Sequence, residues 1–300
     1  MFSADNYIAV DWGSSNLRLW VWQDGECVWQ YASAQGVTRQ KPGGFSDLWQ
    51  TLLATCPVPL AANTQVIMSG MIGSNMGWVT APYLTCPTAI ASLADHLTVV
   101  EEAGPFPVFI VPGLQLPGPD TFNVMRGEET QLYGALGDEH WYVFPGTHSK
   151  WVSVENGMVC DFQTIMTGEL FHLLSTQSVL QLPHTPQQEC DALFLQGAQW
   201  GAQETCLSRG AFLLRSRMLC NALDPTCLHS ALSGFLIGHE IARMQNHYRI
   251  TPKDTLVIIG SDSLLARYQT LIHQFGLTCR VVKGDAAFLA GIRSILHAHD

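Results

Sequence analysis

The chain has 300 residues, of which 47% are hydrophobic and 13% charged, and its formal net charge is −10. Length and composition exclude a largely disordered chain and indicate a globular protein of about two domains. The acidic balance argues against nucleic acid and anionic membranes as partners, because both need a basic surface. No apolar run is long enough for a membrane span or a signal peptide, which indicates a cytoplasmic protein.

The first predicted element is a β-hairpin. Residues 7–10 are typical of a buried strand, and residues 17–22 alternate apolar side chains with Arg18 and two tryptophans, as in a strand with two different faces. The turn between them begins at Asp11, which would hold Mg²⁺ through water. Its backbone N–H groups and hydroxyls suit a polyphosphate, although an ordinary hairpin turn is the alternative. The residues of this predicted loop are Gly13, Ser14, Ser15 and Asn16.

The following residues complete a predicted first domain. We expect a third strand at 26–32, a helix at 45–55 and short buried strands at 65–68 and 107–111. A segment rich in proline and glycine follows the last of these strands. The pattern therefore predicts a first domain at residues 1–118 and a second at residues 119–300.

Two loops of the first domain contain candidate ligand-binding residues. Residues 36–44 form a polar turn that carries Arg39, one of few basic residues in an acidic half of the chain. Residues 69–78 contain three glycines beside Ser69, Ser74 and Asn75. Such a segment indicates either backbone that approaches a ligand closely or a plain connecting loop.

The second domain opens on a charged motif and then repeats the first hairpin. Glu128 and Glu129 stand at the start of a predicted helix, where acidic residues also serve simply to complement the helix dipole. Strands at 141–145, 150–154 and 158–164 then follow with a polar turn between the first two. This repetition indicates an internal duplication, with two facing lobes that each supply one loop to a nucleotide.

The remaining residues alternate helices with buried strands. Helices are predicted at 168–174, 189–195 and 231–242, and glycines four residues apart in the last of these indicate close helix packing. A strand at 256–259 ends in a Gly-Ser-Asp-Ser turn. A helix, a strand and a final helix complete the chain.

These segments together resemble a sugar kinase of the actin, hexokinase and Hsp70 superfamily. The amino-acid sequences of three motifs closely resemble those of the 2-dehydro-3-deoxygalactonokinase family. These motifs are Asp-Trp-Gly-Ser-Ser-Asn-Leu-Arg, Asn-Val-Met-Arg-Gly-Glu-Glu-Thr-Gln and Pro-Gly-Thr-His-Ser-Lys-Trp. The resemblance covers nearly the whole chain. It implies an α/β fold of two ribonuclease-H-like domains with a nucleotide cleft between them, and transfer of phosphate from ATP to the C6 hydroxyl of 2-dehydro-3-deoxy-D-galactonate, with Mg²⁺, in galactonate degradation.

The resemblance also implies roles for individual residues. Asp11 and Arg18 fall in the first phosphate loop with the four residues named above. The second phosphate loop corresponds to Gly146, Thr147, His148 and Ser149. The segment that meets adenosine corresponds to Gly260, Ser261 and Asp262. Lys150 would offset phosphate charge. Glu128 lies where related kinases carry an aspartate base, and the extra methylene leaves Glu129 as an alternative.

The substrate contacts follow from charge and position. Arg126 or Arg39 would pair with the carboxylate of the sugar acid, a bidentate contact that a neutral hexose could not make. Ser69, Ser74 and Asn75 are candidates for the sugar hydroxyls. Two other readings remain open: a kinase for another acid such as 2-dehydro-3-deoxygluconate, and an ATP-driven binding protein of the same fold. Many such kinases are dimers, so the resemblance allows a homodimer.

Overall fold

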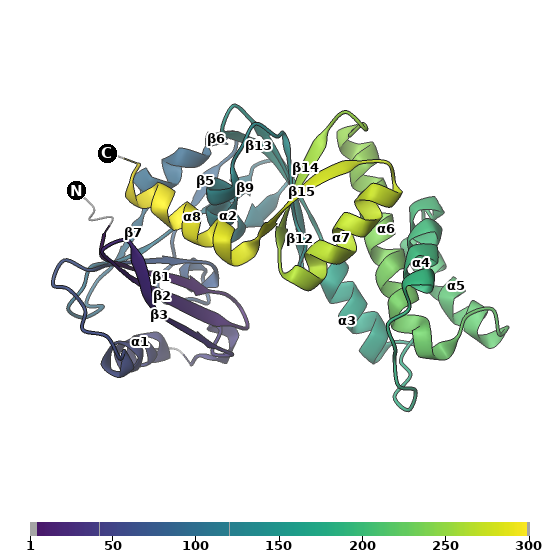
Figure 1. Cartoon of the computed structure of the whole chain (residues 1–300), viewed down its shortest axis with the longest axis horizontal. Coiled ribbons are helices and arrows are strands. Elements are labelled where there is room, and N and C mark those ends of the chain that lie inside the picture. Colours follow the sequence, from purple (N-terminus) through teal and green to yellow (C-terminus); the bar gives the residue numbers. More distant parts are fainter. Residues whose placement is uncertain (1–4, 42, 120, 299–300) are drawn as a thin grey trace. The chain divides into compact units, whose positions relative to one another are not determined.

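The computed structural model describes residues 5–41, 43–119 and 121–298, and the chain divides into two units (Figure 1). Unit 1 comprises Met1–Asp138, Ser153–Phe162 and Gly284–Asp300, and unit 2 comprises Glu139–Val152 and Gln163–Lys283. Residues 1–4, part of the amino-terminal stretch in which no signal peptide is expected, lie outside the described residues. The domain division expected after residue 118 stays a prediction.

Unit 1 is built on a six-stranded sheet. The predicted hairpin is formed by β1 (Tyr7–Trp12) and β2 (Leu17–Gln23), and β3 (Glu26–Ser33) extends it. On the other side of β1 lie β4 (Gln65–Ser69), β8 (Val108–Ile110) and β7 (Thr98–Val100), which gives the order β3-β2-β1-β4-β8-β7. Since β1 runs parallel to β4, their carboxyl ends meet at one edge.

Helices cover both faces of this sheet (Figure 1). On one face, α1 (Gly44–Thr55) packs Phe45 edge-on against Trp12 in a buried apolar cluster. On the other face, α8 (Gly284–Leu296) places Phe288 against Trp20 and Arg293 over Trp22. The predicted alternation of β2 is therefore confirmed, because its leucines and valine join the α1 side and its tryptophans the α8 side.

The rest of unit 1 supports the carboxyl edge of the sheet. A small sheet contains β5 (Tyr83–Thr85), β9 (Gly113–Leu116) and β10 (Asn123–Met125), and β10 leads into α2 (Glu128–Ala135). The helix α2 packs closely on α8. A Cβ on Gly134 of α2 would lie 2.0 Å from the Ala287 carbonyl oxygen of α8, so this contact leaves no room for a side chain. Short 3₁₀ helices occur at Val37–Arg39, Met71–Gly73 and Ile90–His96.

Unit 2 repeats the same strand order. The strands β11 (Trp141–Phe144), β12 (Ser149–Glu155) and β13 (Met158–Ile165) form a meander, and β14 (Thr255–Gly260) and β15 (Thr278–Lys283) add parallel strands beside β11. The order β13-β12-β11-β14-β15 matches β3-β2-β1-β4-β8. The predicted sequence repeat is thus a repeat of structure. Residues 153–155 of β12 and 158–162 of β13 belong to unit 1, where the start of β13 pairs with β6 (Thr88–Ala89).

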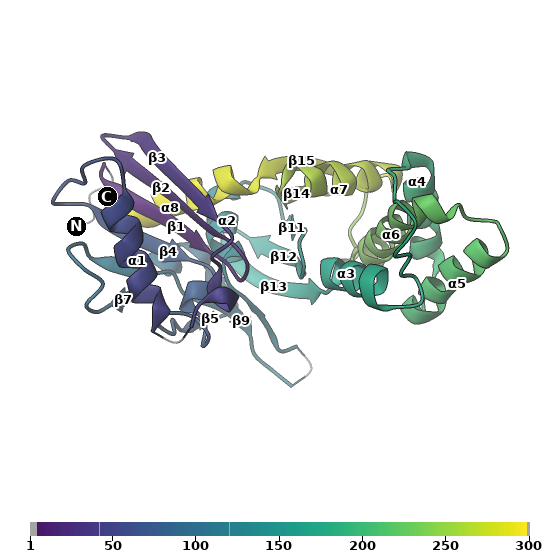
Figure 2. The same ribbon diagram turned by 90° about the horizontal axis from the view of Figure 1, so that it is seen from below.

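Five helices accompany this sheet, and Figure 2 shows α4, α5 and α6 grouped together. They are α3 (Thr167–Gln177), α4 (Asp191–Gln203), α5 (Leu207–Leu219), α6 (Leu228–Tyr248) and α7 (Asp262–Gln274). A Cβ on Gly234 of α6 would lie 1.9 Å from the Phe194 carbonyl oxygen of α4. The predicted packing role of the α6 glycines is therefore confirmed. Among the described helices, none is long and apolar enough to cross a membrane.

Candidate functional site

The carboxyl ends of β1 and β4 place polar residues at one edge of the unit 1 sheet. Asp11 of β1 is in register with Ser69 of β4. The Asp11 carboxylate forms an ion pair with the Arg18 guanidinium, which comes from the neighbouring strand β2. Burial raises the pKa of Asp11, while Arg18 opposes that shift. The hairpin therefore joins the predicted metal-holding acid to the predicted phosphate-binding cation.

Arg18 has a second acidic partner. Its guanidinium also forms an ion pair with Asp285, in the first turn of α8. Asp285 is more than half exposed, and its negative charge adds to the factors that raise the pKa of Asp11. The sequence pattern assigns Asp285 no role of its own. An acidic residue directly after a glycine at the start of a helix was a signal that could have indicated such a role.

The segment after β3 forms backbone hydrogen bonds with the first predicted phosphate loop. Backbone N–H groups of residues 36–38 donate to carbonyl oxygens of residues 13–15 at 2.9 to 3.1 Å. A Cβ on Gly36 would lie 2.3 Å from the Ser14 carbonyl oxygen, so this close approach requires glycine. The side chains at positions 14–16 are exposed, and so is Arg39 at the end of the same 3₁₀ helix.

The start of α2 lies beside this edge of the sheet. Gly127 precedes the helix with φ of 108°, a conformation that favours glycine. A Cβ on Gly127 would lie 3.4 Å from the Cα atom of Gly70, and a Cβ on Gly70 would lie 3.4 Å from Oδ1 of Asp11. The two glycines therefore bring the acidic start of α2 into the neighbourhood of Asp11.

The two glutamates of α2 have different environments. Glu129 is fully buried, and its carboxylate oxygens accept the Gly127 N–H at 2.8 and 2.7 Å. Glu128 is partly exposed, and its Oε2 accepts the Arg126 N–H at 3.2 Å. Burial, assisted by the Glu128 charge, raises the pKa of Glu129 to about 8. The two side chains consequently differ in accessibility, and Glu129 stays largely protonated at neutral pH.

Replacing Glu129 with glutamine should change how stability depends on pH. The unfolded side chain titrates near 4.5 and the folded one near 8, so the native state retains a proton that the unfolded state releases. Native stability from this group is therefore complete below about pH 4.5 and declines as the pH rises to about 8. As the pH rises from about 4.5 to about 8, the unfolding free energy of Glu129→Gln should therefore increase by roughly 4 kcal/mol relative to that of the wild-type protein. Unfolding free energies at pH 5 and pH 8 measure this, and parallel pH profiles would contradict it.

Arg126 is a buried cation with unused donors. Only 9% of the residue is exposed, and its guanidinium lies 4.3 Å from the centre of the Tyr83 ring. One terminal nitrogen donates to the Ala81 carbonyl oxygen at 2.7 Å. In the described part of the chain, neither its Nε nor its other terminal nitrogen has a hydrogen-bond partner. Burying donors without acceptors is costly, so these atoms indicate a place for an anionic ligand.

The candidate hydroxyl ligands differ in exposure. Ser69 is buried, and its hydroxyl lies 2.7 Å from the Thr130 hydroxyl and 3.5 Å from Glu129. Ser74 is also buried, and its hydroxyl accepts the Met76 N–H at 3.2 Å. Asn75 is exposed. Ser69 thus supports the start of α2 within the described structure.

The second predicted phosphate loop lies in unit 2, between β11 and β12. Thr147 and His148 are exposed, and the His148 imidazole contacts the carboxylate of Glu169 of α3. A Cβ on Gly168 of α3 would lie 2.5 Å from the Gly146 carbonyl oxygen, whereas a Cβ on Gly146 would meet no atom within 4 Å. The loop therefore packs closely against α3 and leaves space at Gly146.

Two neighbouring residues anchor this loop to β12. The Ser149 hydroxyl is buried and lies 3.1 Å from the Tyr268 hydroxyl of α7. The Lys150 ammonium, also buried, donates to the His148 carbonyl oxygen at 3.4 Å. Both contacts fix the loop at the point where the strand begins.

The predicted adenosine segment ends β14 and begins α7. Gly260 is the last residue of the strand, Ser261 is the N-cap position, and Asp262 is the first helical residue. The exposed carboxylate of Asp262 forms an ion pair with Lys283 at 3.1 Å. This segment stands at the carboxyl end of β14, where ligands of parallel sheets commonly bind.

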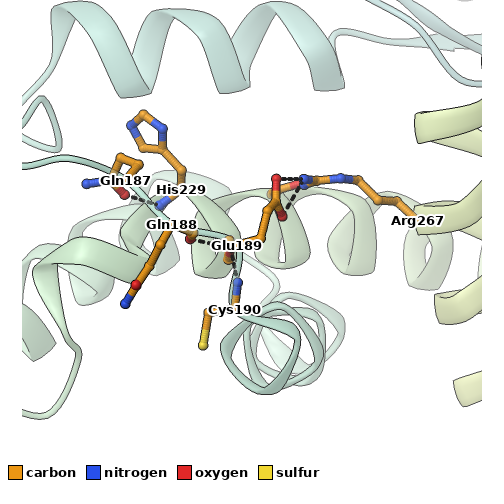
Figure 3. A network of polar contacts seen from close by, with 8 residues as sticks. Gln187, Gln188, Glu189, Cys190, His229 and Arg267 are labelled. Atoms are coloured by element: carbon orange, nitrogen blue, oxygen red, sulfur yellow. Dashed lines mark hydrogen bonds and ion pairs between the residues drawn. The ribbon is translucent and has the colours of Figure 1, made fainter.

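A cavity of about 450 Å³ lies within unit 2 beside both of these segments. Gly146, Thr167 and Ser263 line it, together with the start of α6 and residues 187–189. Figure 3 shows Glu189 facing Arg267, with two contacts of 2.9 Å. The Arg267 guanidinium also donates to Ser233 of α6 at 2.8 Å. The ion pair therefore ties the segment before α4 to α7 along the cavity wall.

Residues 187–189 and the start of α6 are functional candidates that sequence reasoning missed. In Figure 3, Gln187 lies beside His229, and its side-chain oxygen accepts the His229 backbone N–H at 2.9 Å. Burial lowers the pKa of the His229 imidazole. No motif marks these residues, because they come from an irregular segment and a helix that meet only in the fold. The predicted site residues thus fall into one group in unit 1 and another in unit 2.

Comparisons with known proteins identify related chains. The chain is 40% identical to 2-dehydro-3-deoxygalactonokinase of Escherichia coli (strain K12), over 97% of this chain and 98% of that protein. A crystal structure from Sinorhizobium meliloti that bears the same kinase name has a TM-score of 0.89 and 33% identity, and covers 97% of this chain and 98% of that one.

A more distant structure supports the fold alone. Component A of (R)-2-hydroxyglutaryl-CoA dehydratase from Acidaminococcus fermentans has a TM-score of 0.51 at 12% identity, over 98% of this chain and 97% of that one. The expected actin-like α/β fold is confirmed by these likenesses. The 2-keto-3-deoxy-galactonokinase family model matches residues 11–295, and the chain therefore belongs to the 2-keto-3-deoxy-galactonokinase family.

Proposed function

We propose that the chain transfers the γ-phosphoryl group of ATP to the C6 hydroxyl of 2-dehydro-3-deoxy-D-galactonate. Family membership supports the reaction class. The observation that carries the substrate class is the Arg126 guanidinium, which is buried and has two nitrogens without partners in the described structure. The carboxylate of a sugar acid is an anion that accepts hydrogen bonds from a guanidinium.

Arg126 suits a sugar acid better than Arg39 does. Its ring contact with Tyr83 and its bond to the Ala81 carbonyl oxygen fix the guanidinium plane, so little conformational freedom is lost when a ligand binds. Arg39 is exposed and lies in a short 3₁₀ helix. We therefore assign the carboxylate contact to Arg126.

Glu128 is the better candidate for the general base. Its side chain is partly exposed and follows Gly127, which lies against Gly70 at the same edge as Asp11. Glu129 is buried, and its pKa of about 8 keeps it largely protonated at neutral pH. A base must be ionised and must reach the hydroxyl whose proton it accepts. In this proposal Glu129 instead holds the backbone N–H of Gly127 and so supports the start of α2.

Unit 2 has the features of a nucleotide site. Its cavity of about 450 Å³ is large enough for a purine and ribose, and it adjoins the loop at Gly146 and the start of α7 at Ser263. The open space at Gly146 allows backbone N–H groups to approach a phosphate. We assign the base and ribose to the cavity, and the phosphates to the loop that begins at Gly146.

The residues at the β1 edge also fit Mg²⁺, which the family implies together with ATP. Asp11 supplies hard oxygen ligands, and in the described chain no cluster of three or more metal-binding side chains competes for an ion. A single carboxylate suits Mg²⁺ that retains most of its water and arrives with the nucleotide. The ion would neutralise phosphate charge. Arg18, which contacts Asp11, would share that task and orient the carboxylate.

Filling the cavity should weaken nucleotide binding. Ser263 is an exposed residue of its lining, so Ser263→Trp should place an indole into the space without disturbing the core. The dissociation constant of a nonhydrolysable ATP analogue should rise at least about tenfold, which calorimetric titration measures. Thr270→Trp is the matched control, because Thr270 is exposed on the same helix and does not line the cavity. Equal affinity of the two variants for the analogue would refute the assignment of the nucleotide to this cavity.

A coupled ADP-release assay tests the substrate assignment. The panel consists of 2-dehydro-3-deoxygalactonate, its gluconate epimer and neutral aldoses. We expect the galactonate derivative to have the highest kcat/KM and the neutral sugars to lie near background, because they cannot pair with Arg126. A preference for a neutral hexose would refute the proposal, and a preference for the epimer would change the substrate within the same class.

A further inference from the structure

Glu240 of α6 is a buried carboxylate that collects hydrogen bonds from three other elements of unit 2. The residue is 2% exposed. The Trp151 indole N–H of β12 donates to it at 2.7 Å, and the Tyr268 hydroxyl of α7 donates at 2.8 Å. The Thr167 hydroxyl of α3 is a third donor. A fully buried carboxylate is costly unless such donors satisfy it, so this arrangement is specific to its partners.

Two of these donors adjoin the proposed nucleotide site. Thr167 and Tyr268 line the cavity, and Thr167 directly precedes Gly168, which packs against Gly146. The Tyr268 hydroxyl also lies 3.1 Å from the hydroxyl of Ser149, at the end of the phosphate loop. Glu240 is therefore one fixed point to which the loop, the start of α3 and the wall formed by α7 are all attached.

The chemistry of the donors explains why a carboxylate is needed. An indole N–H can only donate, so Trp151 requires an acceptor. A carboxylate has two oxygens and can accept from all three donors together, whereas an amide has one acceptor and one donor group. In Glu240→Gln, the amide oxygen would serve Trp151, and its NH₂ group would face the hydroxyls of Thr167 and Tyr268. Those hydroxyls would have to reverse their direction, which also disturbs the contact of Tyr268 with Ser149.

We infer that Glu240 is a positioning residue for ATP: through Thr167, Trp151 and Tyr268 it holds the second phosphate loop and the cavity wall in their binding geometry. This inference rests on the proposed assignment of the nucleotide to unit 2. Glu240 is a positioning residue because its side chain acts through its hydrogen-bond partners and does not contact the nucleotide. Its effect is transmitted by three hydrogen bonds, and the network acts as a unit because its members share one acceptor.

The test is binding of a nonhydrolysable ATP analogue to Glu240→Gln. We expect the dissociation constant and the KM for ATP to rise about tenfold, with the KM for the sugar acid unchanged. Tyr268→Phe, which removes one donor and keeps the ring, should raise the dissociation constant by a smaller factor. In the double variant the two effects should not add, because they act through one network.

The matched control is Ile241→Val, a neighbouring buried position of α6 in the apolar core of unit 2. It should lower the melting temperature and leave nucleotide affinity at the wild-type value. A folded Glu240→Gln protein with wild-type affinity for the analogue would overturn the inference. If that variant does not fold, wild-type affinity of Tyr268→Phe overturns it instead. Failure of Ser263→Trp to weaken binding, by contrast, refutes the cavity assignment of the proposed function.

Discussion

Glu128→Gln is expected to lower kcat at least about a hundredfold, with little change in the KM for ATP. The amide keeps the size and the hydrogen-bonding reach of the side chain, so it removes chiefly the ability to accept a proton. Loss of a positioned base costs roughly 10²- to 10⁴-fold in rate. Steady-state kinetics with both substrates varied gives kcat and the two KM values separately.

The control for this variant must remove an equivalent charge elsewhere. Asp47 lies exposed in the first turn of α1, so Asp47→Asn loses the same favourable interaction with a helix dipole without touching the site. Its kcat should equal that of the wild-type enzyme. A near-normal kcat for Glu128→Gln, combined with a large loss in Glu129→Gln, would transfer the role of base to Glu129.

Arg126→Ala should raise the KM for the sugar acid about 10- to 100-fold, while the KM for ATP stays within about twofold. The charged fork would lose its contact with the substrate carboxylate, which neither water nor a neighbouring residue can replace in a buried position. Arg126→Lys should recover only part of the affinity, because an ammonium cannot form the planar bidentate contact. The same steady-state measurements decide this.

Arg293→Ala is a control for the loss of arginine–aromatic packing that accompanies Arg126→Ala. Its guanidinium lies 4.0 Å from the centre of the Trp22 ring and donates to the Tyr7 hydroxyl at 3.2 Å, so it resembles Arg126 in its ring contact. Tyr7 is at the opposite end of β1 from the site. Arg293→Ala should therefore reduce stability and leave both KM values unchanged. If Arg126→Ala raises the two KM values equally, Arg126 binds phosphate and not the sugar acid.

Much of the fold could be predicted because its signals are local. Strict alternation at 17–22 identified β2 and assigned its two faces, which pack on α1 and on α8. The repeated meander identified the matching sheet of unit 2, and the spacing of small residues indicated close packing of α6, whose partner in the structure is α4. The pairing of Asp11 with Arg18 also follows from one hairpin, since the two residues are in register across it.

The parts of the site that depend on distant contacts could not be predicted. The buried state of Glu129 and the stacking of Arg126 on Tyr83 require β4, β5 and α2 to meet. A glutamate in the apolar run of α6 was a visible signal, but its partners Trp151, Thr167 and Tyr268 come from three other elements. Helix α5 was missed, although Ala211, Leu214 and Met218 are spaced along one buried side of it. The homodimer stays a prediction.

A crystal structure with 2-dehydro-3-deoxygalactonate and a nonhydrolysable ATP analogue tests the central claim most directly. The proposed function predicts that the sugar carboxylate accepts hydrogen bonds from the Arg126 guanidinium, and that the C6 hydroxyl lies within hydrogen-bonding distance of the Glu128 carboxylate. A sugar acid whose carboxylate contacts other residues, or whose C6 hydroxyl lies away from Glu128, would contradict it.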